Sequence, residues 1–192
     1  HASPIQVQLT TLDSTGKEEL VTYTVPNKNN LFTKVIPTGS GALVKSDRSF
    51  IAFSMTDTEM YTDKIGGGTE MLGGMAFEWG CALMPTNQLT PQVLVGWGHG
   101  CTGNNCMGKT ERSAVWITPM EDANVYVDYE NRGDPKQYGI FPVKKLQSIR
   151  IRDHNDTDMS GAIIFATKMS ENTHTGTPVN IASAWGQDPS VS

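Results

Sequence analysis

The chain has 192 residues, of which 18% are charged, and its formal net charge is −5 at pH 7. Acidic residues outnumber basic ones and no basic block is present, so we expect no nucleic-acid partner. No apolar run reaches the roughly 20 residues that a membrane-spanning helix needs, so we also expect no insertion into a membrane. The length suffices for one domain with a hydrophobic core or for two small β units.

Short segments in which apolar and polar residues alternate recur along the chain, and turn-forming residues separate them. Near the N-terminus, for example, Ile5, Val7 and Leu9 alternate with polar residues, as in a strand with one face in water. No amphipathic helical pattern of ten or more residues is present. The predicted strands are residues 5–12, 19–25, 31–36, 42–45, 49–55, 77–83, 93–97, 112–118, 124–130, 140–143, 146–152, 161–167 and 179–185.

Many short strands with regular turn signals predict an all-β, β-sandwich-like fold. We treat residues 1–192 as a single β-rich module, because no clean linker divides the chain. The irregular, glycine-rich stretch 56–74 is the best boundary if the chain instead forms two packed β units.

Residues 76–106 are the stretch around which we expect the chain to be organised. Two alternating runs, the first containing Trp79 and the second Val95, flank a polar turn at 86–90. Pro85 and Pro91 bracket this turn, and proline fits poorly inside a central strand. The pattern predicts two strands with a short connection, and both faces of the second strand look covered.

Three cysteines are present, and two of them lie in the glycine- and asparagine-rich loop that ends this stretch. Cys101 and Cys106 are close enough in sequence to form a disulfide, as is favoured in a secreted protein. The alternative is a zinc site completed by His99, although closed zinc sites usually have four ligands. Cys81 shares a strand face with aromatic residues, so we expect a buried free thiol.

An acidic loop precedes the predicted strand 161–167. Calcium takes six to eight oxygen ligands, and clustered carboxylates repel one another unless a cation or hydrogen-bond donors offset their charge. The alternative is a solvated turn in which Asp and Asn side chains cap backbone amides. The sequon Asn155-Asp156-Thr157 adds a third possibility, because a glycan on Asn155 would exclude ligation by that side chain. The proposed calcium ligands are Asp153, Asn155, Asp156 and Asp158.

A second oxygen-rich turn spans residues 128–134. It could bind an ion of its own, but Arg132 lies within it and favours a salt-bridged turn. We therefore expect calcium at the first loop rather than at this one.

His1 raises the hypothesis of a copper site, because copper polysaccharide monooxygenases use an N-terminal histidine together with a second histidine. His99, His154 and His174 are the available partners. The alternative is that His1 is simply the first residue of a processed or excised piece of a longer protein. No hydrolase elbow, pair of catalytic acids or nucleotide fingerprint is recognisable.

Four motifs in the second half of the chain occur in an order that resembles a known module. They are Leu-Thr-Pro-Gln-Val-Leu-Val-Gly at 89–96, Ala-Val-Trp-Ile-Thr-Pro at 114–119, Val-Tyr-Val-Asp-Tyr at 125–129 and Ala-Trp-Gly-Gln-Asp-Pro at 184–189. The chain is similar to modules of large, repetitive bacterial surface proteins of the adhesin and IgG-Fc-binding type. It also resembles the GDPH domain of diatom cell-surface and adhesive-trail proteins.

The resemblance implies a non-enzymatic adhesion or matrix module that is secreted or displayed at the cell surface. The acidic element that contains Asp156, Asp158 and Gly161 matches a turn in the bacterial versions, which favours calcium. If Gly-Asp-Pro preceded His1, the chain would begin just after an Asp-Pro self-cleavage site.

The expected function is therefore adhesion to an extracellular matrix or to a surface polysaccharide or protein. Exposed aromatic rings would favour sugar binding, because ring faces stack on pyranoses. The proposed ligand-binding residues are Trp97, His99 and Trp185. The alternatives are a carbohydrate-active enzyme, a copper monooxygenase that uses His1, and a structural spacer.

Overall fold

The computed structural model of this chain describes residues 4–26, 30–37, 39–56, 79–96, 115–155 and 158–185. Within these ranges the protein is all-β, with short 3₁₀ helices at Thr86–Gln88 (η1), Pro135–Gln137 (η3) and Met169–Glu171 (η4), which confirms the predicted fold class. None of the helices in these ranges has the length and apolar character to cross a membrane. The strands are β1 (Ile5–Leu12), β2 (Glu18–Val25), β3 (Ala42–Ser46), β4 (Phe53–Thr56), β5 (Trp79–Ala82), β6 (Gln92–Leu94), β7 (Val115–Pro119), β8 (Ala123–Asp128), β9 (Gly139–Val143), β10 (Ile149–Ile151), β11 (Ile163–Lys168) and β12 (Ile181–Trp185).

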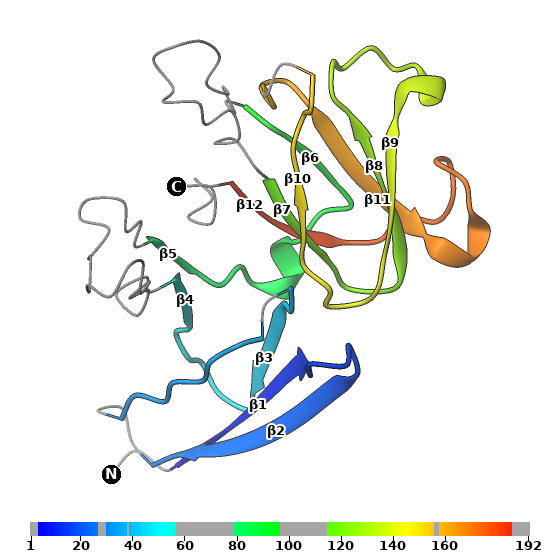
Figure 1. Cartoon of the computed structure of the whole chain (residues 1–192). Coiled ribbons are helices and arrows are strands. Elements are labelled where there is room, and N and C mark those ends of the chain that lie inside the picture. Colours follow the sequence, from blue (N-terminus) through cyan, green and yellow to red (C-terminus); the bar gives the residue numbers. More distant parts are fainter. Residues whose placement is uncertain are drawn as a thin grey trace, which may run out of the picture.

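The strands of the described residues form antiparallel sheets (Figure 1). Strands β2, β1 and β3 form the N-terminal sheet, and β4 pairs with β5 in a two-stranded ladder. The four-stranded sheet β6-β11-β8-β9 and the three-stranded sheet β10-β7-β12 form a sandwich, to which we refer by that name below. All of these pairings are antiparallel.

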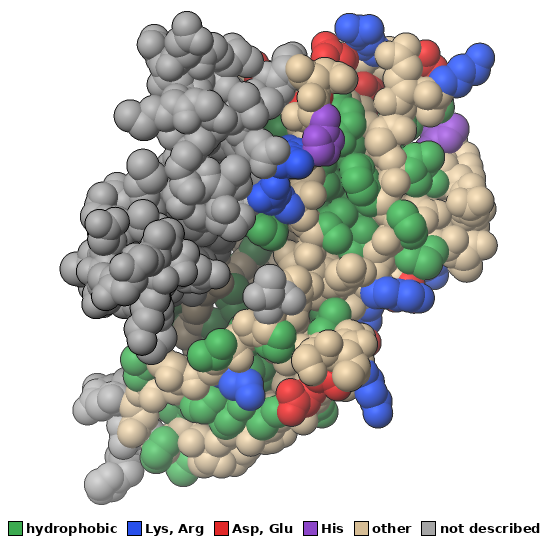
Figure 2. Space-filling view, viewed as in Figure 1, with side chains coloured by type: hydrophobic (Ala, Val, Ile, Leu, Met, Phe, Trp, Pro, Cys, Tyr) green, Lys and Arg blue, Asp and Glu red, His purple; other side chains and the backbone are tan. Residues whose placement is uncertain are grey.

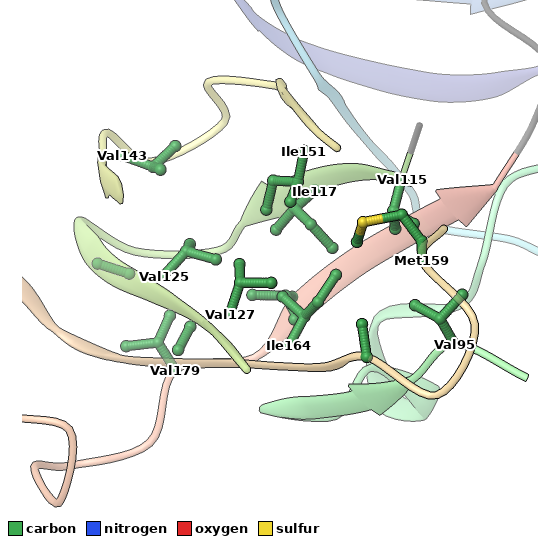
Figure 3. Packing of buried hydrophobic residues seen from close by; sticks show 14 residues of the cluster. Val95, Val115, Ile117, Val125, Val127, Val143, Ile151, Met159, Ile164 and Val179 are labelled. Carbon is green, nitrogen blue, oxygen red and sulfur yellow. The ribbon is translucent and has the colours of Figure 1, made fainter. Parts of the chain in front are cut away.

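The hydrophobic core lies between the two sheets of the sandwich (Figure 3). Val125, Val127 and Ile164 of one sheet face Ile117 and Ile151 of the other, and all five are almost completely buried. The side chains alternate in and out along each strand, so every second residue of β7, β8 and β11 enters this core. All residues of the cluster lie between positions 95 and 181.

The N-terminal sheet joins the sandwich through two loops that exchange backbone hydrogen bonds. Gly41 N donates to Leu146 O at 2.6 Å, and Ser148 N donates to Gly39 O at 2.8 Å. Leu146 is buried and has a φ of 60°, a left-handed conformation that is unusual for a leucine. The contact is reinforced from the first hairpin, because Lys145 Nζ lies 2.7 Å from Glu18 Oε2.

Several predicted strands differ from the observed ones for identifiable reasons. No strand forms at 31–36, where Leu31 is exposed and Phe32 packs on Tyr23 of β2 with 3.7 Å between ring centroids. The predicted strand 146–152 begins only at Ile149, because residues 145–147 form the turn that contains Leu146. The predicted boundary at 56–74 lies almost wholly outside the described residues, so the subdivision stays a prediction.

The two strands predicted within the stretch 76–106 are present as β5 and β6, but they belong to different sheets, so this stretch does not form one unit around which the chain is organised. Strand β5 pairs with β4, whereas β6 pairs with β11 in the sandwich. The expectation that β6 is covered on both faces is also wrong, because Leu94 is 64% exposed.

Candidate functional site

The predicted calcium loop connects β10 to β11 at one end of the sandwich (Figure 1). Met159 anchors this loop in the core, and Gly161 N donates to Val95 O at 2.7 Å. Asp153 is only 3% exposed. Its Oδ1 accepts a hydrogen bond from Asn155 N at 2.6 Å, whereas its buried Oδ2 has no hydrogen-bond partner.

The other proposed calcium ligands are placed differently. Asn155 is exposed, and Asp158 Oδ1 accepts from Ser160 N at 2.7 Å, as in a capped turn. Asp156 lies outside the described residues. Among the residues that the structure describes, no group of three or more His, Cys, Asp and Glu side chains could hold a metal ion. The loop therefore contributes one buried, half-satisfied carboxylate and one capping carboxylate.

The second oxygen-rich turn is held by its own hydrogen bonds. Asp128 is buried, and its two carboxylate oxygens accept from Arg132 N at 3.1 Å and from Gly133 N at 2.7 Å. Arg132 Nη2 lies 3.5 Å from Glu130 Oε2, which confirms the predicted salt-bridged turn. Both oxygens of Asp128 are thus used for the turn itself.

Tyr129 lies in the second turn, and its hydroxyl is affected by the charge of Asp153 in the first loop. Burial raises the pKa of the Tyr129 hydroxyl, and the nearby Asp153 carboxylate raises this pKa further. The hydroxyl therefore stays protonated at neutral pH beside a carboxylate.

Most of the other residues proposed from the sequence are not among those that the structure describes. His1, Trp97, His99, Cys101 and Cys106 lie outside the described residues, so the disulfide stays a prediction and the N-terminal copper site stays an alternative hypothesis. The side chain of Cys81 is likewise outside them.

Trp185, at the end of β12, is 48% exposed. It lines a cavity of about 170 Å³ together with Val93, Val95, Val115 and Ser183, where β6 of one sheet approaches β7 and β12 of the other. The side chains that line it are mainly aliphatic.

An aromatic cluster that the sequence analysis did not identify lies on the outer face of the four-stranded sheet. Tyr126 of β8 stacks on Phe165 of β11, with ring centroids 5.2 Å apart and ring planes within 14°. Tyr138 meets Phe165 edge-on at 5.6 Å, and His174 meets both tyrosines edge-on at 6.1 and 6.3 Å. We call these four residues the aromatic cluster.

The sheet register explains how residues so far apart in sequence come together. Phe165 pairs with Tyr126 across β11 and β8, and Tyr126 pairs with Ile140 across β8 and β9. Directly opposed side chains on one face of an antiparallel pair are in contact. The signal was present in the sequence, because Tyr126 alternates with the core residues Val125 and Val127, but the long-range pairing was not.

A short loop brings His174 to the aromatic cluster. Glu171 accepts hydrogen bonds from Thr177 N and Thr177 Oγ1, both at 2.6 Å, and these bonds lower the pKa of the Glu171 carboxyl. Thr167 Oγ1 donates to Thr173 O at 2.7 Å from the adjacent strand. The loop is therefore closed on itself and tied to β11.

Comparisons with protein-family models, with curated proteins and with solved structures find no match to this chain.

Proposed function

We propose that this chain is a non-catalytic extracellular adhesion or matrix module of a larger surface protein, and that it holds a polysaccharide or protein partner. The exposure of large apolar side chains supports this proposal. Leu94 and Ile140 on the sandwich are 64% and 55% exposed, and Leu31 and Ile51 in the N-terminal part are exposed still further. Figure 2 shows hydrophobic side chains gathered on the surface of both regions. Uncovered apolar surface of this kind is typical of interaction sites.

The sequence resemblance to adhesin-like and GDPH-type surface modules supports the same proposal, and so does a cysteine pair suited to an oxidising compartment. A secreted or surface-displayed protein meets polysaccharides and matrix proteins directly.

Calcium belongs to the proposal as a structural ion. The unpartnered Oδ2 of buried Asp153 fits a cation, because a buried carboxylate oxygen without a donor is destabilising. Asp158 would have to contribute an oxygen that does not cap Ser160 N. The ion would hold the loop between β10 and β11 in place and would take no part in a reaction.

The experiment is a retention assay combined with a turnover assay. The purified chain is passed over immobilised polysaccharides and matrix proteins, with an unrelated acidic protein as the control, and the bound material is analysed for released products. We expect retention without product. Product whose formation is lost when His1 is removed would replace the proposal with a copper enzyme, and passage through every surface would leave a structural spacer.

A further inference from the structure

We propose that the outer face of the sheet β6-β11-β8-β9 is a binding site for a neutral polysaccharide, centred on the rings of Phe165 and Tyr138. This inference rests on the proposed function, because it names the partner that the adhesion module holds and the surface that holds it. It assigns the ligand to residues other than Trp97, His99 and Trp185, which the sequence analysis proposed.

The rings are held in fixed positions before any ligand arrives. Tyr126 is buried at the base of the aromatic cluster and stacks on Phe165, while Phe165 and Tyr138 are half-buried and His174 is exposed. Each upper ring contacts at least one other ring, so its rotamer freedom is already limited. Rigid aromatic side chains supply contact area at a low entropic cost on binding.

The face presents a row of residues across the four strands, in which one residue is buried and the other three are at least partly exposed. The register places Gln92, Phe165, Tyr126 and Ile140 side by side across the four strands. Adjacent strands lie about 4.8 Å apart, so the row is roughly 14 Å long. Leu94 on β6 and Ile140 on β9 remain exposed at the two edges of the sheet. A row of this length suits a chain of sugars more than a single one.

The polar groups on this face are almost entirely uncharged. Gln92 carries an exposed amide, whereas Asn124 and Thr167 are buried and their side chains hydrogen-bond the loop that carries His174. The strand positions that the register places on this face, within the described ranges, include no Glu, Lys, Arg or His, and the one Asp there, Asp128, already accepts backbone hydrogen bonds at both of its oxygens. An anionic polymer would need Lys or Arg side chains here. Ring faces combined with the exposed amide of Gln92 match the C–H faces and hydroxyls of a neutral sugar.

The supporting loop extends the platform beyond the strands. Thr167 holds Thr173 O, and Asn124 Nδ2 donates to Asn172 Oδ1 at 3.4 Å, so the loop that carries His174 is attached to both β11 and β8. The two bonds from Thr177 to Glu171 close the same loop. A site supported in this way keeps its geometry when a ligand binds.

Affinity electrophoresis of the full chain tests this inference. The gels contain a soluble neutral β-glucan, a neutral mannan or the polyanion alginate, and a parallel assay measures retention on an immobilised matrix protein. We expect retardation by at least one neutral polysaccharide and none by alginate. Tyr138→Ala and Phe165→Ala should each weaken this binding about tenfold, the order that the loss of one stacked ring costs.

The matched control is Tyr23→Ala, which removes a ring that packs against Phe32 in the N-terminal part and should leave the affinity unchanged. Tyr138 lies outside the strands, so Tyr138→Ala keeps the test valid if Phe165→Ala fails to fold, and Tyr138→Phe should retain binding. Circular dichroism of each variant checks the fold.

The outcomes separate this inference from the proposed function. Equal binding by the wild type, Tyr138→Ala and Phe165→Ala would show that the site lies elsewhere. Retention on the matrix protein without retardation by any neutral polysaccharide would overturn the sugar assignment and leave the adhesion function standing. If the chain shows no retention on the matrix protein and no retardation by any polysaccharide, both this inference and the proposed function are contradicted.

Discussion

Two buried aspartates show how differently the same side chain is used within one end of the sandwich. Asp128 has both carboxylate oxygens occupied by backbone N–H groups, whereas Asp153 has one oxygen occupied and one without a donor. A buried polar group that lacks a hydrogen-bond partner destabilises the folded protein, whereas one whose partners are present does not. Asp128 therefore stabilises its turn, and Asp153 is stabilising only if a further donor or a cation completes it.

Replacing Asp128 should reveal this difference. Asp128→Ala leaves Arg132 N and Gly133 N without their acceptor in a partly buried turn, so we expect the free energy of unfolding to fall by about 1–3 kcal/mol. Denaturation by urea measures the change. Asp134→Ala is the control, because Asp134 also accepts two hydrogen bonds but from exposed partners, and its loss should be smaller. Equal losses in the two variants would contradict this account.

At the scale of elements, the loop between β10 and β11 combines a firm anchor with an incomplete polar centre. Met159 is fully buried in the core, and the backbone of Gly161 and Ala162 exchanges hydrogen bonds with Val95. The acidic residues precede this anchor, so their positions are limited by it but not determined by it.

Calcium should raise the stability of this loop if the ion binds only to the folded protein. Mass action then adds about 2.7 kcal/mol when free calcium exceeds the dissociation constant a hundredfold. We expect the melting temperature to rise with calcium and to fall with a chelator, and Asp156→Ala and Asp158→Ala to abolish the difference. Asp134→Ala should preserve it. Identical melting curves in calcium and in chelator would favour the turn in which Asp153 and Asp158 cap backbone amides.

At the scale of the whole molecule, a few close backbone contacts attach the N-terminal sheet to the sandwich. Gly41 approaches both Leu146 O and the side chain of Thr118 on β7. A Cβ atom on residue 41 would overlap Thr118 Cγ2. The absence of a side chain at Gly41 is thus what lets the two parts come this close.

Gly41→Val should weaken this junction. The added side chain must displace Thr118 or the loop that contains Leu146, and overpacking of this kind costs about 1–3 kcal/mol. Thermal melting measures the loss of stability, and limited proteolysis should show earlier cleavage between the N-terminal sheet and the sandwich. Gly96→Ala is the control, since a Cβ there meets nothing within 4 Å. A variant as stable and as resistant to protease as the wild type would rule out a tight junction at Gly41.

The sequence by itself determined the fold class and most of the strands. Alternation with a period of two is a local property, so it located β1 at Ile5–Leu12 without any knowledge of its partners. The salt-bridged turn at Arg132 could be predicted for the same reason, because its partner Glu130 lies two residues away. Neighbours in sequence are enough to decide such features.

Only the tertiary structure decided which strands pair and which side chains meet. Strands β5 and β6 are consecutive, yet they join different sheets, and β6 instead pairs with β11, which lies about seventy positions later in the chain. The aromatic cluster depends on this kind of pairing, because Tyr126, Phe165 and His174 come from separate elements. The burial of Asp153 is likewise set by the packing of the sandwich around it. Alternation shows which residues of a strand point away from the core. Their neighbours on the adjacent strands depend on the register between segments that are distant in sequence, and no local pattern encodes that register.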